Sequence, residues 1–263
     1  MKLKIYQIDA FTDTVFKGNY AAVIILKEWL STELMQQIAT ENNLSETAFV
    51  FKNTQNIYEI RWFSPITEID FCGHATLAAA FVLFKENESL EKVIFTAKAV
   101  GDLSVEKLDS DYIQMSFPNR KPKVVDSIPQ ELLNGLSITP KEVLLNQQAY
   151  FAILSKEEDV YSVKTNLNEL KKLAPYDVVV TSKSTEYDFI SRYFWPANGG
   201  EEDPVTGSIH AGLAPYWAEK LNKNELIAHQ ASKRGGLLKC KVLEDKVIIS
   251  GQAVLYLEGY ITI

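Results

Sequence analysis

The sequence RWFSP at residues 61–65 returns as RYFWP at residues 192–196. Each copy is followed by a loop that enters a predicted helix through a glycine and a small or polar residue. A second match lies further along each half, where Ala97, Gly101 and Leu103 have counterparts at the same spacing in Ala231, Gly235 and Leu237. Coincidence would explain one short match, but two separated matches in the same order indicate an internal duplication.

The order of predicted elements repeats in the same way. Hydrophobic periodicity in the first half predicts two strands, a helix that Ser31 caps, two more strands and a small-residue-rich helix, at residues 3–9, 21–26, 31–43, 47–52, 58–63 and 74–84. The second half predicts a strand, a helix, two strands and a helix, at residues 149–154, 166–173, 177–181, 189–194 and 208–221.

This repeated order predicts two similar α+β halves, each with a sheet wrapped around a buried helix. We expect an N-terminal half at residues 1–117, completed by residues 252–263, and a C-terminal half at residues 118–251. The segment PNRKP at residues 118–122 is typical of an exposed connection, because it holds two prolines and two basic residues.

Composition limits the possible functions. The chain has 263 residues, 46% of them hydrophobic, which fits one large domain or two of ordinary size. A net charge of −7 argues against nucleic acid or an anionic membrane as a partner. No apolar run near the start predicts a signal peptide, and no stretch approaches the roughly 20 apolar residues of a membrane helix. With Cys72 and Cys240 as the only cysteines, we expect no disulfide framework and a cytoplasmic location.

The two glycine entries to the central helices are candidate binding elements. The first reads CGHAT at residues 72–76, and the second reads DPVTGS at residues 203–208. Helix N-termini present unpaired N–H groups, and glycine allows close approach of a ligand, so two such ends suit a carboxylate. The alternative is an ordinary pair of helix starts, with Thr206 or Ser208 as the cap of the second.

Three polar residues beside these entries are candidates for chemistry, and each also has an ordinary structural explanation. Glu46 precedes an apolar strand, where a glutamate is usually solvated. His74 begins a helix of Ala, Leu, Phe and Val and could be a satisfied core histidine. Asp203 precedes Pro204, as many turn residues do. Whether these side chains meet does not follow from the residues alone.

A family resemblance rests on several blocks that occur in order from the N-terminus to about residue 240. They are DAFTD and FKGN at 9–13 and 16–19, NLSETAF at 43–49, RWFSP and CGHAT, EDPVTGS at 202–208 with His210 and Tyr216-Trp217, and QASKRGG at 230–236. Together they resemble the phenazine biosynthesis PhzF-like family, which has the diaminopimelate epimerase-like fold. The resemblance therefore implies an α+β fold of two pseudo-symmetric halves, each a curved, mostly antiparallel sheet around a central helix. The chain is similar to that family over most of its length, so the match is more specific than a single glycine-rich loop.

The resemblance implies a function and a set of site residues. The family's type member isomerises a dihydro-hydroxyanthranilate without metal or cofactor, and members are usually homodimers. Carried over, the resemblance implies catalytic Glu46, His74 and Asp203, and substrate binding by Gly73, Gly207 and Ser208. We therefore expect a biosynthetic isomerase that acts by a proton shift, with Glu46 as the general base on a small carboxylate-bearing substrate.

The chain departs from the family pattern around these blocks. Tyr20 stands where a proline commonly follows Gly-Asn, Ile209 replaces the usual alanine, and the loop at residues 197–200 differs from the commoner form. The proton-transfer residues remain, but the identity of the substrate is open, because loops around a site decide what it accepts.

Metal and nucleotide chemistry find little support in the sequence. The three histidines, His74, His210 and His229, have no metal-ligand spacing, and no dinucleotide or phosphate-binding glycine loop is present. We expect no cofactor and no metal, and we expect His210 to brace the second helix entry.

Other readings stay open. A racemase with two thiol bases is disfavoured, because Pro204 is the expected counterpart of Cys72 and Cys240 lies in a strand pattern. An epimerase that pairs Glu46 with some other base is a second possibility. A non-catalytic member that binds a metabolite or a protein is the alternative from another class, because a fold by itself does not establish chemistry.

Overall fold

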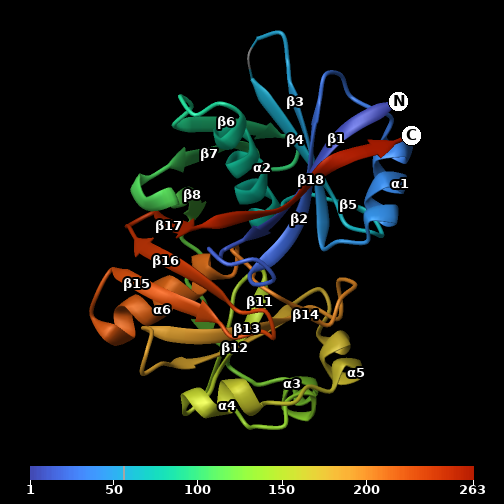
Figure 1. Cartoon of the computed structure of the whole chain (residues 1–263). Coiled ribbons are helices and arrows are strands. Elements are labelled where there is room, and N and C mark those ends of the chain that lie inside the picture. The colour runs from blue at the N-terminus through green and yellow to red at the C-terminus, as the bar shows by residue number, and fades with distance from the viewer. Residues whose placement is uncertain (56) are drawn as a thin grey trace. The chain divides into compact units, whose positions relative to one another are not determined.

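The computed structural model describes residues 1–55 and 57–263. The chain divides into two compact units: unit 1 comprises Met1–Ser116 and Ser250–Ile263, and unit 2 comprises Phe117–Ile249. The elements are strands and a smaller number of helices in each unit (Figure 1). The predicted α+β class is therefore confirmed.

Unit 1 is built on a mostly antiparallel sheet. Its strands are β1 (Lys2–Ala10), β2 (Asn19–Leu26), β3 (Glu46–Lys52), β4 (Tyr58–Phe63), β5 (Glu68–Ile69), β6 (Lys92–Ala97), β7 (Gly101–Lys107), β8 (Ile113–Pro118) and β18 (Ala253–Thr262). The pairs β2–β3 and β4–β6 are parallel. The pairs β1–β18, β1–β2, β3–β4, β4–β5, β6–β7 and β7–β8 are antiparallel. Because β18 pairs with β1, the two chain termini lie side by side (Figure 1).

Helix α2 (Gly73–Glu86) is the central helix of unit 1. Most of its residues are buried, including the run Ala78, Ala79 and Ala80. Small side chains let the helix contact β1, β2, β3, β7 and β18 closely (Figure 1). A helix that is apolar on nearly every side is stable only inside a core, so its sequence alone requires this position.

Helix α1 (Thr32–Asn42) covers another face of unit 1. Ser31 caps it, because its Oγ accepts a hydrogen bond of 3.2 Å from the backbone N–H of Leu34. Met35, Ile38 and Ala39 are buried, and Asn43 ends the helix in the left-handed conformation. The sequence predicted both this helix and its cap.

Unit 2 repeats the strand arrangement of unit 1. Its strands are β9 (Lys123–Val124), β10 (Glu142–Leu145), β11 (Ala149–Ile153), β12 (Asp177–Lys183), β13 (Phe189–Phe194), β14 (Glu202–Asp203), β15 (Glu225–Gln230), β16 (Gly236–Val242) and β17 (Lys246–Gly251). The pairs β11–β12 and β13–β15 are parallel, as are β2–β3 and β4–β6. The pairs β12–β13, β13–β14 and β15–β16 are antiparallel, like their counterparts.

Equivalent residues occupy equivalent registers in the two units. Phe63 pairs with Thr47, and Phe194 in the second copy of the motif pairs with Val178. The arginine of each copy makes the same bidentate bond to a glutamate on the next short strand, Arg61 to Glu68 at 2.7 Å and Arg192 to Glu202 at 2.8 and 2.9 Å. The echo between residues 61–65 and 192–196 therefore reflects one structural role used twice.

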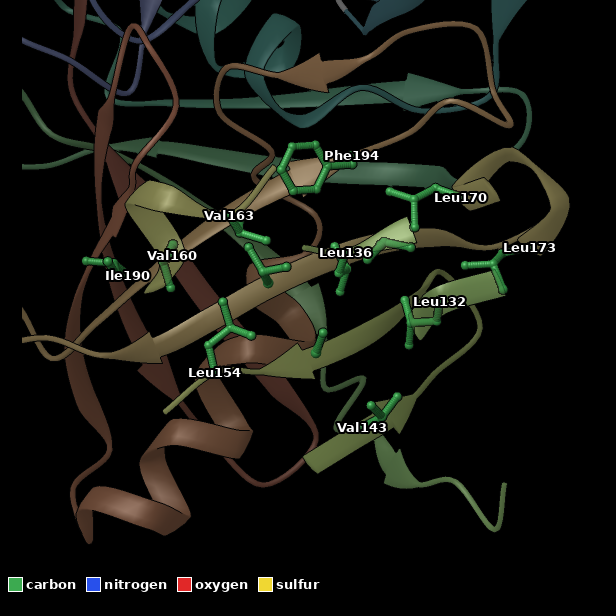
Figure 2. Packing of buried hydrophobic residues seen from close by; sticks show 13 residues of the cluster. Leu132, Leu136, Val143, Leu154, Val160, Val163, Leu170, Leu173, Ile190 and Phe194 are labelled. Atoms are coloured by element: carbon green, nitrogen blue, oxygen red, sulfur yellow. The ribbon is translucent and has the colours of Figure 1, made fainter. Parts of the chain in front are cut away.

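The helices of unit 2 enclose a second apolar core. Helices α3 (Gln130–Gly135), α4 (Glu157–Ser162) and α5 (Leu167–Leu170), with the 3₁₀ turn Lys171–Leu173, supply side chains to it. Figure 2 shows these side chains gathered over the strands, among them Leu132, Leu136, Leu154, Val160 and Leu170. Burial of each such side chain contributes about 1.5–3 kcal/mol to the stability of the folded unit.

Helix α6 (His210–Leu221) is the central helix of unit 2 and packs against β15 and β16. It contains Pro215, which has no N–H, so the carbonyl of Ala211 is left without its helical partner. The backbone N–H of Arg120 donates to that carbonyl at 3.0 Å. The segment at residues 118–122 is thus anchored to α6, and Pro122 is buried. The predicted exposed connection therefore holds at Pro118 and Lys121 but not at Pro122, because the proline in α6 provides an acceptor that ties Arg120 to the helix.

The close packing of α6 can be tested by a substitution at Gly212. A Cβ at this position would lie 2.6 Å from Cζ of the buried Phe151 and 2.9 Å from Nδ2 of Asn146. Although Ala favours helices, we expect Gly212→Ala to lower the free energy of unfolding in urea by about 1–3 kcal/mol, as overpacking does. Gly259→Ala is the control, since the nearest atom to its Cβ would be Leu257 Cδ2 at 3.8 Å. A Gly212→Ala protein as stable as the control would contradict this packing.

Candidate functional site

Glu46 and His74 form the polar centre of unit 1. Glu46 is the first residue of β3 and His74 is the second residue of α2, and both are buried. Because α2 packs against β2 and β3, it brings Nε2 of His74 to 2.8 Å from Oε2 of Glu46. The N–H is not aligned with the oxygen as in a good hydrogen bond, so the contact is best described as a close ion pair.

Two further residues set the orientation of the His74 ring. Ser45 Oγ donates to Oδ1 of Asn19 at 3.1 Å, which fixes the Asn19 amide. The Asn19 amide nitrogen then lies 3.1 Å from Nδ1 of His74 and donates to it. With Nδ1 as the acceptor, the proton of a neutral ring is on Nε2 and faces Glu46. Asn19 therefore assigns the tautomer of the neutral ring. When the ring is protonated, Nδ1 is a donor and the Asn19 amide presents its oxygen to it instead.

Electrostatics favour a charged pair at this place. Burial disfavours the imidazolium, but the Cys72 sulfur and the Glu46 carboxylate raise the pKa of His74 well above its ordinary value of 6.5. The unit thus holds a carboxylate against an imidazolium in a protected position. Charged pairs in the interior are costly to desolvate, so such a pair is weak evidence for a stabilising role and better evidence for a catalytic or binding role.

Cys72 lies beside this pair but is not a base. Its Sγ is 3.4 Å from Nδ1 of His74, and the side chain is buried. Burial and the nearby charge of Glu46 raise the pKa of the Cys72 thiol to about 11. At neutral pH it is a protonated thiol, which agrees with its interpretation as a small buried apolar residue.

The second glycine entry lies in unit 2 and is held by a residue of β15. Thr206 donates through Oγ1 to the carboxylate of Asp203, and its backbone N–H donates to Oε1 of Gln230 at 2.9 Å. The amide nitrogen of Gln230 donates to the Asp203 carbonyl at 2.8 Å. Ser232 adds a bond from Oγ to the Pro204 carbonyl at 2.8 Å. The block at residues 230–236 therefore fixes the backbone of residues 203–207.

Ser208 belongs to a chain of polar side chains within unit 2. Its Oγ accepts a bond of 3.0 Å from Nε2 of Gln148, and the same nitrogen donates to the Tyr193 hydroxyl at 3.1 Å. Tyr193 donates to Oδ2 of Asp177 at 2.5 Å. Ser208 does not cap α6, which has no side-chain cap. The alternative of an ordinary serine cap is therefore wrong.

His210 braces this helix entry, as predicted. It is fully buried, and Nδ1 donates to the Thr206 carbonyl at 2.9 Å. In unit 1, Thr76 Oγ1 donates to the Cys72 carbonyl at 2.6 Å in the same arrangement. The counterpart of Cys72 is therefore Thr206, and the expectation that Pro204 matches it is wrong. The conclusion is unchanged, because Thr206 supplies no second thiol.

The PhzC-PhzF family, described as phenazine biosynthesis-like protein, matches residues 8–259. The chain belongs to this family. An uncharacterized isomerase from Halalkalibacterium halodurans is 47% identical over 98% of both chains, and one from Pseudomonas aeruginosa is 44% identical over 98% of both. Because these relatives are named as isomerases, the comparisons support an isomerase-type role for this chain as well.

Solved structures agree with this assignment. A PhzF-family protein from Enterococcus faecalis has a TM-score of 0.95 at 44% identity and covers 100% of both chains. A hydroxyproline epimerase from Agrobacterium vitis shares the fold alone, with a TM-score of 0.63 at 10% identity over 99% of this chain and 92% of that one. These matches confirm the diaminopimelate epimerase-like fold of the PhzC-PhzF chain.

The predicted site residues of this PhzC-PhzF member fall into two groups. Glu46, His74 and Gly73 lie together in unit 1 at the starts of β3 and α2. Asp203, Gly207 and Ser208 lie in unit 2 on one segment between β14 and α6. The assignment of catalytic and binding roles to these residues stays a prediction.

Sequence reasoning missed the residues that support both groups. From the sequence, Asn19 was only one residue of the block FKGN at 16–19, and no role was predicted for Gln148 or Asp177. A usable signal existed for Asp177, because it stands at the same distance before Arg192 as Glu46 does before Arg61. The roles of Asn19 and Gln148 depend on which side chains they contact, and no spacing in the sequence reveals that.

Glu46, Cys72 and His74 are also close enough to be examined as metal ligands. One ligand atom from each lies within 4.8 Å of the others. However, Nε2 of His74 already faces Oε2 of Glu46 at 2.8 Å, and Nδ1 faces the Asn19 amide nitrogen at 3.1 Å. In the described residues this group therefore fits an acid/base pair better than a metal site. No helix in the described part of the chain is long and apolar enough to span a membrane.

The charge of His74 can be measured directly. In an NMR pH titration of the histidine rings, His74 should stay protonated above pH 6.5, its ordinary value. Its raised pKa stabilises the fold fully below pH 6.5, and that contribution is lost as the pH rises through the folded-state pKa. Glu46→Gln leaves burial in place but removes the carboxylate, so the pKa of His74 should fall.

His210 serves as the internal control in the same spectra. Burial lowers the pKa of His210 to about 4, so this ring should stay neutral throughout the range in which His74 titrates. An unchanged His74 titration in the Glu46→Gln protein would show that the ion pair does not set its charge.

Proposed function

We propose that this chain is a cofactor-independent isomerase that moves a proton by general acid/base catalysis within a small carboxylate-bearing substrate. The substrate would be an amino- or hydroxy-acid-like molecule related to dihydro-hydroxyanthranilate. The observation that carries the proposal is the buried contact of 2.8 Å between Glu46 and His74. A carboxylate in this position can accept a proton from carbon and return it, with no oxidant, reductant or leaving group.

Glu46 is the general base in this proposal. Its carboxylate removes a proton from an acidic carbon, and the electron pair is delocalised over the conjugated system of the substrate. The same carboxyl group then delivers the proton to another carbon of that system, so the bond broken and the bond formed are both C–H. General acid/base catalysis of this kind contributes about 10²–10⁴-fold to a rate.

His74 is proposed to assist this proton movement. Its raised pKa keeps a positive charge beside Glu46, which compensates negative charge at this buried position. Asn19 holds the ring so that Nε2 faces Glu46. The geometry supports a pair in which one member exchanges a proton with the substrate and the other compensates its charge.

Asp203, Ser208 and the glycines Gly73 and Gly207 are proposed to bind the substrate or assist the proton shift. The resemblance carries these roles, and the rigid setting of residues 203–207 by Gln230 supports them. Backbone N–H groups and a serine hydroxyl stabilise negative charge that develops on a carboxylate. Asp203 would hold an amine or hydroxyl of the substrate.

The proposal includes a homodimer in the cytoplasm, with a small molecule and neither nucleic acid nor a membrane as its partner. The family resemblance supports the dimer. The two buried free thiols, Cys72 and Cys240, and the net charge of −7 support the remaining points.

The acid/base role of Glu46 is tested by deuterium uptake from solvent. Dihydro-hydroxyanthranilate and a panel of amino and hydroxy acids are incubated with the protein in deuterated buffer and followed by NMR and mass spectrometry. Wild type should isomerise or exchange at least one of them. Glu46→Gln should lower that rate by at least about 10²-fold, because the base is removed while the shape is kept.

Glu41→Gln is the matched control, because Glu41 is an exposed glutamate of α1. It should retain the wild-type rate. A Glu46→Gln protein as active as this control would refute the proposed base, and a wild type that binds but exchanges none of the compounds would favour the non-catalytic alternative.

A further inference from the structure

The strand registers give Glu46 a counterpart in unit 2. In the parallel pair β2–β3, Glu46 lies opposite Ala21, and in the equivalent pair β11–β12, Asp177 lies opposite Ala149. Each carboxylate is the first residue of its strand, and both are buried. The duplicated frame thus places a buried carboxylate at the same point in both units.

The residue that follows the helix-entry glycine is polar in both units. His74 follows Gly73, and Ser208 follows Gly207. In unit 1 the carboxylate of Glu46 reaches His74 directly. In unit 2 the corresponding side chains, Asp177 and Ser208, are shorter than Glu46 and His74. The hydroxyl of Tyr193 and the amide of Gln148 therefore connect them.

The hydrogen atoms of this connection can be assigned from its acceptor. Asp177 accepts from Tyr193 at Oδ2 and from Asn198 Nδ2 at Oδ1, at 2.8 Å. The Tyr193 hydrogen is therefore committed to Asp177, so the Tyr193 oxygen can only accept from Gln148. The NH₂ group of Gln148 must therefore face Tyr193. One of its hydrogens donates to the Tyr193 oxygen and the other donates to Ser208.

Ser208 is the end of the chain of donors. Its Oγ accepts from Gln148, and among the residues the structure describes its own O–H has no acceptor. A serine whose oxygen already accepts from a fixed amide offers a ligand its hydrogen. Such a group favours an anionic acceptor, because hydrogen bonds to a charged acceptor are the stronger ones.

We propose that Asp177, Tyr193 and Gln148 are positioning residues that fix the Ser208 hydroxyl as a hydrogen-bond donor, and that they thereby select a carboxylate over a neutral carboxamide. The inference rests on the proposed role of Ser208 in substrate binding and adds the residues that give Ser208 its direction. Asp177 sets the direction of all the hydrogen bonds between it and Ser208, since its carboxylate can only accept.

Two substitutions reverse this direction without a large change of shape. Gln148→Glu replaces both donors with acceptors, so Ser208 would donate to the new carboxylate and a negative charge would stand near the ligand. Asp177→Asn keeps the Oδ1 acceptor for Asn198 and places an NH₂ group towards Tyr193, so Tyr193 would donate to Gln148 and the amide would turn.

The test uses anthranilate and anthranilamide, which differ in the carboxylate alone, and measures both dissociation constants by NMR titration at pH 7. Wild type should prefer anthranilate. Gln148→Glu and Asp177→Asn should each weaken anthranilate binding by about tenfold or more while anthranilamide binding stays nearly unchanged. Gln130→Glu is the control for added charge, because Gln130 is exposed in unit 2, and it should keep the wild-type preference.

The ratio of the two constants separates positioning from a general loss of structure. A variant that had merely unfolded would lose both ligands, and thermal melting checks for this. A wild type without preference for anthranilate, or folded variants that keep the preference, would overturn the inference. If the preference and its loss are observed while wild type exchanges no deuterium, the inference stands and the proposed isomerisation fails.

Discussion

The contact between Glu46 and His74 is the constraint on which unit 1 depends. Placing a carboxylate and an imidazolium in an interior costs several kcal/mol of desolvation, and their mutual attraction offsets this only if the geometry is held. The fold holds it through two independent elements, because β3 fixes Glu46 from the sheet and α2 fixes His74 from the core helix. Asn19 and Ser45 complete the setting by orienting the ring.

Duplication explains how the same arrangement of strands holds a different polar pair in each unit. Both units use the same sequence of parallel and antiparallel strand pairs, and both fix the short strand after the central hairpin by an arginine–glutamate bond. Within this frame, the first unit has glutamate and histidine in direct contact, and the second has aspartate and serine joined by two intermediates. The backbone was thus preserved while side-chain length and charge diverged, which is how a shared fold accommodates separate chemical tasks.

Much of the fold could be predicted because periodicity and repetition are local. The strand at residues 189–194 has the predicted bounds, and the helix predicted at residues 74–84 extends over Gly73–Glu86. The two-residue strands β5 and β14 and the short helix α4 were missed, because segments of this length have no period to detect. The anchoring of residues 118–122 was missed for a different reason, since it depends on a carbonyl freed by Pro215 far along the chain.

The candidate site was less accessible from sequence than the fold. Glu46 and His74 were named through a family resemblance, and their contact follows from strand register and helix packing, which no spacing of residues encodes. The networks around Asn19, Gln148 and Gln230 were unforeseen because an amide side chain acquires its role from its neighbours. Thr206, rather than Pro204, proved to match Cys72 once the bond to each carbonyl was known.

A single-turnover isotope experiment tests the central claim most directly, namely that one buried carboxylate both removes and returns the proton. A substrate deuterated at the donor carbon is converted in ordinary water by an excess of enzyme, and the product is analysed by mass spectrometry. A single base predicts that some product molecules carry the deuterium at the receiving carbon. Product with no transferred deuterium, even at the shortest times, would contradict the account and indicate that a second group delivers the proton.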